Sequence, residues 1–174
     1  LQLMQHSSGI ADYRNEKGFD VSADYRPEQL IETVATIPLA FEPGTDVKQS
    51  ATNFLLLTSI IEKAGKMSYH DFVKKYQIDY LGLKQTFFGE DLAKVKQEDV
   101  TLTGNVHQTF KKDKDYINPS ETTTGYVEKE GRLVAAPAVS PTAMKGFSDI
   151  WASAENVSHW DIGLAGSALI EKPE

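Results

Sequence analysis

The sequence predicts a mainly α-helical domain with one small β-hairpin. Three stretches space their apolar residues as amphipathic helices do, namely residues 27–37, 50–65 and 68–80. Strand-like patterning is clear where residues 125–127 and 132–135 flank the turn sequence Lys129-Glu130-Gly131. Helices are therefore expected to dominate the fold.

The helix expected after the turn at Pro43-Gly44 is the most apolar element of the chain. Ser50 or Thr52 can accept a hydrogen bond from the free N–H groups that open a helix. Gly65 is expected to end this helix in the left-handed conformation. The buried stripe is expected to consist of Leu56, Ile60, Ile61 and Ala64, widened by Phe54, Leu55 and Leu57.

Weaker signals define the elements on either side. Pro27 is well placed as the first residue of the helix over 27–37. Gly82 is expected to end the helix over 68–80, and residues 144–154 and 160–170 are expected to form short helical segments. The residues of the 68–80 helix that are expected to face inward are Phe72, Val73 and Tyr76.

The composition is that of one domain with a core, spanning residues 1–174. The chain has 40% hydrophobic residues, a net charge of −7 and no cysteine. This charge disfavours nonspecific nucleic-acid or anionic-membrane binding, and no apolar run approaches the roughly 18 residues of a membrane span. The four histidines are widely separated, so a zinc site is not expected. No metal or cofactor is predicted for this chain. Because residues 1–8 read as the last turns of a helix, we expect a fragment of a longer protein.

Four segments over residues 1–86 resemble one enzyme family. One segment resembles the second-motif region of serine β-lactamases and penicillin-binding-protein-like hydrolases. It consists of FEPGT at 41–45, followed by Ser50, TNFLLL at 52–57 and IIE at 60–62. LMQHSSGI at 3–10, SYHDF at 68–72 and YLGLKQT at 80–86 resemble three further segments of that family, in the same order. The branch concerned contains class C β-lactamases and D-alanyl-D-alanine carboxypeptidases.

The resemblance implies a fold and an activity for the parent protein. The chain would be the helical subdomain of an α/β serine hydrolase fold, without most of the sheet domain. Its parent would hydrolyse amides or esters through an acyl-serine, with cell-wall peptide or a β-lactam as ligand, in the periplasm or outside a bacterial cell. The family needs Ser-x-x-Lys, Tyr-x-Asn or Ser-x-Asn, and Lys-Thr-Gly or His-x-Gly.

The first and third motifs do not occur in this sequence. The resemblance places the nucleophile before Leu1 and the third motif beyond Glu174. The chain is therefore expected to be catalytically incomplete and to carry no catalytic residue. Thr142-Ala143-Met144-Lys145, which comes nearest to the first motif, has threonine in place of serine.

The second motif should be present, and there the sequence departs from the pattern. Gln49-Ser50-Ala51 stands where the family has Tyr-Ser-Asn, which makes these three residues the candidate binding residues. A glutamine amide does not take up a proton near neutral pH, and an alanine side chain cannot hydrogen-bond a substrate. Tyr13-Arg14-Asn15 and Tyr116-Ile117-Asn118 match Tyr-x-Asn at other positions, where chance is the simpler interpretation. His6-Ser7-Ser8 is interpreted as a structural turn.

Three functions stay open at this point. The chain is part of an active serine hydrolase, or part of an inactive relative that binds cell-wall ligands, peptides or a protein partner. The third alternative is a helical interaction domain. Gln49 and Ala51 move weight toward the inactive relative, and the four matched segments argue against the interaction domain.

Overall fold

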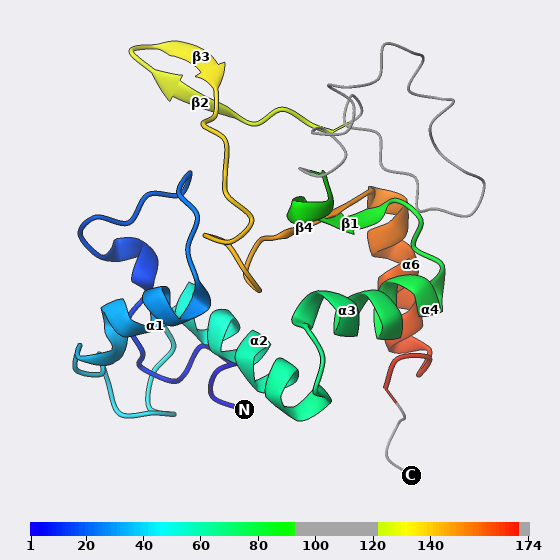
Figure 1. The fold of residues 1–174 in the computed structure, drawn as a ribbon, viewed down its shortest axis with the longest axis horizontal. Coiled ribbons are helices and arrows are strands. Elements are labelled where there is room, and N and C mark those ends of the chain that lie inside the picture. Colours follow the sequence, from blue (N-terminus) through cyan, green and yellow to red (C-terminus); the bar gives the residue numbers. More distant parts are fainter. Residues whose placement is uncertain (93–121, 171–174) are drawn as a thin grey trace. The chain divides into compact units, whose positions relative to one another are not determined.

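The computed structural model describes residues 1–92 and 122–170, which form two compact units (Figure 1). Unit 1 consists of Leu1–Tyr69 with Pro137–Asp149, and unit 2 of His70–Ala136 with Ile150–Glu174. The single domain expected over residues 1–174 stays a prediction. Among the described residues, no helix combines the length and hydropathy needed to cross a membrane.

Unit 1 is built on two α-helices and one short 3₁₀-helix. These are η1 (Tyr13–Asn15), α1 (Pro27–Ala35) and α2 (Ala51–Gly65). As predicted, α1 begins at Pro27, and its first turn is closed by the Arg26 N–H, which donates to Gln29 Oε1 at 2.9 Å. The helices pack on each other and on η1 around a buried core of Tyr13, Leu30, Val34, Ala51 and Leu55.

Helix α2 exists where the sequence predicts it, and Leu55 is buried as predicted, but none of Leu56, Ile60, Ile61 and Ala64 is fully buried. Ala51, Leu55 and Thr58 are buried, at the spacing i, i+4 and i+7 of one helix face, whereas Ile60 is 53% exposed. The polar residues of the first turn bind the segment before η1, and these contacts set which face turns toward the core. Lys66, with φ of 52°, takes the left-handed conformation expected of Gly65.

Residues 137–149 return to unit 1 as a turn-rich segment held against α2. The helix expected over 144–154 is wrong, because residues 141–147 form turns and a strand follows. Gly146 has φ of 77°, and a Cβ there would lie 2.9 Å from the Phe54 carbonyl oxygen and closer still to Thr58. Only glycine allows so close an approach.

The 68–80 helix of the prediction is three consecutive helical pieces. These are α3 (Tyr69–Val73), the π-helix η2 (Lys74–Ile78) and α4 (Asp79–Leu81), and Gly82 ends them with φ of 66°, as predicted. Val73 faces inward as expected, but Tyr76 is 45% exposed and Ile78 is buried instead. A π turn holds more residues than an α turn, so it rotates the following side chains away from the predicted face.

Unit 2 also contains two small antiparallel sheets. The predicted hairpin is confirmed as β2 (Tyr126–Lys129) and β3 (Arg132–Ala135), with positive φ at Glu130 and Gly131 in its turn. A second pair was not predicted: β1 (Thr86–Phe88) lies beside β4 (Ile150–Ala152). The chain then enters α6 (Ala154–Ala165), which begins six residues before the predicted segment over 160–170.

Candidate functional site

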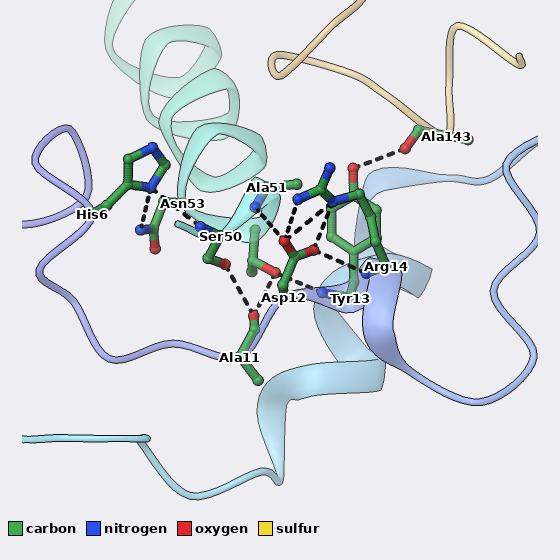
Figure 2. Close-up of polar contacts among 10 residues, drawn as sticks. His6, Ala11, Asp12, Tyr13, Arg14, Ser50, Ala51, Asn53 and Ala143 are labelled. Atoms are coloured by element: carbon green, nitrogen blue, oxygen red, sulfur yellow. Dashed lines mark hydrogen bonds and ion pairs between the residues drawn. The ribbon is translucent and has the colours of Figure 1, made fainter. Parts of the chain in front are cut away.

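The three candidate binding residues lie where α2 begins, and they differ in exposure. Gln49 is exposed, whereas Ser50 and Ala51 are fully buried. The Ser50 hydroxyl donates to the Ala11 carbonyl oxygen at 3.2 Å, and the Ala51 N–H donates to Asp12 Oδ2 at 3.1 Å (Figure 2). Of the three, Gln49 is therefore the residue whose side chain is open to solvent.

The segment before η1 binds the first turn of α2 through buried hydrogen bonds. Thr52 Oγ1 donates to the Ala11 carbonyl oxygen at 2.7 Å and accepts the Tyr13 N–H at 3.1 Å. The Ser8 hydroxyl donates to Asn53 Oδ1 at 2.7 Å. Together these contacts hold residues 49–51 in place. We call the side chains that provide this hold the polar cradle: His6, Ser8, Asp12, Ser50, Thr52 and Asn53.

His6 belongs to the cradle through its ring nitrogen. Its Nδ1 accepts the Ser50 N–H at 3.2 Å and lies 3.4 Å from Asn53 Nδ2 (Figure 2). Its ring centroid lies 5.2 Å from that of Phe54. Ser8 bonds to Asn53, so the hydrogen bonds of both residues converge on the start of α2. This geometry supports the interpretation of His6-Ser7-Ser8 as a structural turn.

Asp12 and Arg14 form an ion pair beside the same helix start. The Asp12 side chain is 4% exposed and lies 2.6 Å from Arg14 Nη2, and the Arg14 guanidinium stands 4.4 Å above the Phe147 ring. Burial alone would raise the pKa of Asp12. Hydrogen bonds from the Arg14 side chain and from the Arg14 and Ala51 N–H groups outweigh it, so this pKa is lowered. Asp12 is therefore an ionised structural carboxylate.

Tyr13 lies in the alternative Tyr-x-Asn match, in which it would be a proton carrier. It is buried in η1, and its hydroxyl donates to the Ala143 carbonyl oxygen at 2.8 Å. Burial, with Asp12 nearby, raises the pKa of Tyr13 to about 12. A general base works best when its pKa lies near the operating pH, so this environment favours a structural tyrosine. The match at Tyr116-Ile117-Asn118 lies outside the described residues.

Thr142 and Lys145 do not form a nucleophile and base pair. The Thr142 hydroxyl donates to Asp24 Oδ1 at 3.2 Å and accepts the Tyr25 N–H at 3.0 Å. Lys145 Nζ instead lies 2.9 Å from Glu62 Oε1 on α2. Each side chain holds the returning segment to a different part of unit 1.

Asp12 and Asn53, the two residues at the centre of the cradle, were not predicted from the sequence. The available signal was that Ser8 and Asn53 are polar residues in two different matched segments. Segments that match one family in a fixed order are expected to pack together in the fold, so their polar side chains are candidates for hydrogen bonds with one another.

The fold is that of a serine β-lactamase-like or penicillin-binding-protein-like chain. The Beta-lactamase family model matches residues 1–173, so the chain belongs to the Beta-lactamase family. The resemblance seen over residues 1–86 is thus confirmed. No curated protein matches the chain significantly.

Solved structures of this fold are similar to the chain at low sequence identity. A D-stereospecific amidohydrolase from Streptomyces sp. has a TM-score of 0.75 and 19% identity, with 98% of this chain and 47% of that chain covered. A penicillin-binding protein from Bacillus halodurans has a TM-score of 0.67 and 18% identity, with 98% of this chain and 47% of that chain covered. A D-amino acid amidase from Ochrobactrum anthropi SV3, complexed with L-phenylalanine, has a TM-score of 0.69 and 14% identity, with 98% of this chain and 43% of that chain covered. The chain thus spans about half the length of these proteins or less.

Proposed function

We propose that this chain is the helical part of a serine hydrolase that cleaves an amide or ester bond through an acyl-serine. In this proposal the nucleophile with its lysine, and the third motif, lie in parts of the protein outside this sequence. Family membership over residues 1–173 supports it, as does a fold shared with an amidohydrolase and an amidase that are about twice as long. The substrates implied are cell-wall peptides, β-lactams or amides of D-amino acids.

The observation that carries the proposal is the family-model match over residues 1–173, and within that match Gln49 stands at the start of α2, where the family has a tyrosine. Gln49 is exposed, while the residue after it is buried and bonded to Ala11. A glutamine amide both donates and accepts hydrogen bonds, but it carries no proton to transfer near neutral pH. We therefore assign Gln49 to substrate binding, and Ser50 and Ala51 to its support. Proton transfer is left to the lysine of the first motif.

An inactive relative that binds cell-wall or peptide ligands, or a partner protein, is the competing function. Gln49 and Ala51 favour it, because both departures from Tyr-Ser-Asn remove groups that the family uses in catalysis. The two functions differ in one measurable property, which is whether a serine in the full-length protein becomes acylated.

The test is intact mass spectrometry of the full-length protein that contains this chain. The protein is incubated with a fluorescent penicillin and, separately, with a fluorophosphonate. We expect a covalent adduct with at least one probe, and faster acylation by penicillin in the Gln49→Tyr variant and in the Gln49→Tyr/Ala51→Asn double variant. Lys63→Gln, an exposed change near the far end of α2, serves as the matched control and is expected to leave the rate unchanged. A folded protein that gives no adduct with either probe would establish the inactive relative.

A further inference from the structure

His6 binds the backbone on both sides of Gln49. Its carbonyl oxygen accepts the Lys48 N–H at 2.9 Å, and its ring Nδ1 accepts the Ser50 N–H at 3.2 Å. One residue thus holds both neighbours of Gln49, the first through its backbone and the second through its side chain. Because Gln49 itself is exposed, the direction of its side chain depends on how these two neighbours are fixed.

The hydrogen bonds around the His6 ring require Nδ1 to carry no proton. A backbone N–H can only donate, so Nδ1 must be the acceptor of the Ser50 N–H. Asn53 Nδ2 lies 3.4 Å from the same nitrogen (Figure 2), and Asn53 Oδ1 accepts the Ser8 hydroxyl at 2.7 Å. Two donors therefore converge on one ring nitrogen. A ring protonated at both nitrogens would turn an N–H toward these donors and could accept neither bond.

The charged groups on the elements packed against His6 lie before η1 and before α2. Asp12, before η1, is ionised at neutral pH, because its hydrogen bonds outweigh burial and lower its pKa. The segment before α2 carries Glu42, Asp46 and Lys48, whose side chains are all exposed, and the first turn of α2 has no charged side chain. A histidine changes its charge between about pH 5 and 8. We therefore assign a change at the start of α2 in that range to His6.

We propose that His6 is the positioning residue of Gln49, and that a proton on the His6 ring weakens substrate binding at Gln49. This inference rests on the proposed function, because it takes Gln49 as the substrate-binding residue. With the ring neutral, the Ser50 N–H is bound and Gln49 is held in one arrangement. With the ring protonated, that bond is lost, and part of the binding free energy is used to restore the arrangement.

The hold on Ser50 is measured first, because this measurement does not depend on any activity. Hydrogen exchange of single backbone amides is followed by NMR on the 174-residue chain labelled with ¹⁵N, and is corrected for the intrinsic effect of pH on exchange. We expect the protection of the Ser50 amide to fall by about two- to tenfold from about pH 8 to about pH 5, as the loss of one hydrogen bond provides. The Tyr13 amide, bound to Thr52 Oγ1, is the internal reference and should keep its protection.

The second measurement is acylation of the full-length protein by the fluorescent penicillin, with the half-saturating concentration separated from the maximal rate. We expect the half-saturating concentration to rise by about two- to tenfold over the same pH range. In Gln49→Ala this rise should disappear, because His6 acts through Gln49. A role of His6 in stability alone would leave the rise in place.

His6→Asn separates the position of the ring acceptor from its protonation. Asparagine puts an amide oxygen about where Nδ1 lies, tolerates the φ of 57° found at His6, and takes up no proton. Both pH effects are therefore expected to disappear in this variant, whereas His6→Ala should show weak protection of Ser50 and weak binding at both pH values. His159→Asn, which removes an exposed histidine of α6, is the matched control and should keep the pH dependence of the wild type.

The two measurements separate this inference from the proposed function. Protection of Ser50 that does not change with pH, or pH effects that persist in His6→Asn, would overturn the role of His6 whether or not the protein is acylated. So would acylation whose half-saturating concentration is the same at both pH values. A folded protein that shows the pH-dependent protection of Ser50 but forms no adduct with either probe would support the hold of His6 on Ser50 and overturn the proposed hydrolase.

Discussion

Asp12 gives the sharpest test of the polar cradle, because one carboxylate serves two parts of unit 1. It accepts hydrogen bonds from the Arg14 guanidinium at 2.6–3.1 Å and from the Ala51 N–H that opens α2 at 3.1 Å. Asp12→Ala removes both, and Asp12→Asn removes the charge but keeps one acceptor oxygen. The two variants therefore separate the ion pair from the hydrogen bond to α2.

The expected losses follow from burial. Removing one partner of a fully buried ion pair costs about 3–5 kcal/mol, but the Arg14 side chain is 31% exposed, so water replaces part of the lost interaction. We expect Asp12→Ala to lower the free energy of unfolding of unit 1 by about 2–4 kcal/mol. Asp12→Asn is expected to lower it by about 1–3 kcal/mol.

The measurement must report on unit 1 alone. Both tryptophans lie in unit 2, so their fluorescence follows the other unit. Hydrogen exchange of the backbone amides of α2, measured by mass spectrometry near pH 7, reports the local opening free energy directly. Exchange is expected to be faster by about tenfold for each 1.4 kcal/mol lost. Peptides from α6 provide the internal reference and should exchange as in the wild type.

The control variant is Asp46→Asn, an exposed carboxylate outside the cradle, expected to change stability by less than about 0.5 kcal/mol. If the α2 amides exchange as slowly in Asp12→Ala as in the wild type, the Asp12 carboxylate does not hold the start of α2 in place.

Acid adds a second signature of the same carboxylate. The pKa of Asp12 is lower in the folded chain than its unfolded value of about 3.9. The contribution of Asp12 to the free energy of unfolding is therefore complete above the unfolded pKa and is lost as the pH falls through the folded pKa. Protection of α2 should decline below about pH 4 in the wild type and decline less steeply in Asp12→Asn.

Three further predictions, made on four substitutions, concern other parts of unit 1. Gly146→Ala should lower the free energy of unfolding by about 2–4 kcal/mol, because residue 146 has a left-handed backbone and the added Cβ would overlap α2. Gly18→Ala, where the backbone is also left-handed but no atom lies within 4 Å of the added Cβ, should lower it by about 1–2 kcal/mol. Urea unfolding followed by circular dichroism compares the two variants. Burial raises the pKa of Tyr13 to about 12, so the contribution of Tyr13 to the free energy of unfolding is complete below about pH 10 and is lost as the pH rises toward 12. Tyr13→Phe should therefore make the stability of unit 1 depend less on pH in this alkaline range. A pH dependence equal to that of the wild type would contradict this. Lys145→Gln should cost less than about 1 kcal/mol, because its pair with Glu62 is partly exposed, and a larger shift in urea midpoint would contradict this.

The elements that the sequence predicted well are those with local signals. Pro27 marks the start of α1, Gly82 ends α4, and Glu130-Gly131 supplies the positive φ angles of a tight hairpin. In each case the deciding interactions lie within a few residues of the signal. These boundaries follow from backbone chemistry that a single sequence displays.

The parts that escaped prediction depend on contacts between distant residues. Ser8 and Asn53, which help to set the buried face of α2, are 45 residues apart. The strand pair of Thr86 with Ala152 closes a still longer loop, and each strand is only three residues long. A three-residue strand has too few positions to show an alternating pattern, so its partner becomes visible only in the fold.

With residues 49–51 as the second motif, as we propose, the cradle explains how that motif can change while the chain keeps the fold of the Beta-lactamase family. The cradle holds the start of α2 without using the side chains of Gln49 and Ala51; position 51 contributes through its backbone N–H. A change of the side chain at position 49 therefore leaves the support intact. The two positions differ in what reversal would cost, because Gln49 is exposed and accepts a tyrosine freely, whereas Ala51 is fully buried and an asparagine there must displace its neighbours. Position 49 is thus the one at which the fold leaves function free to change.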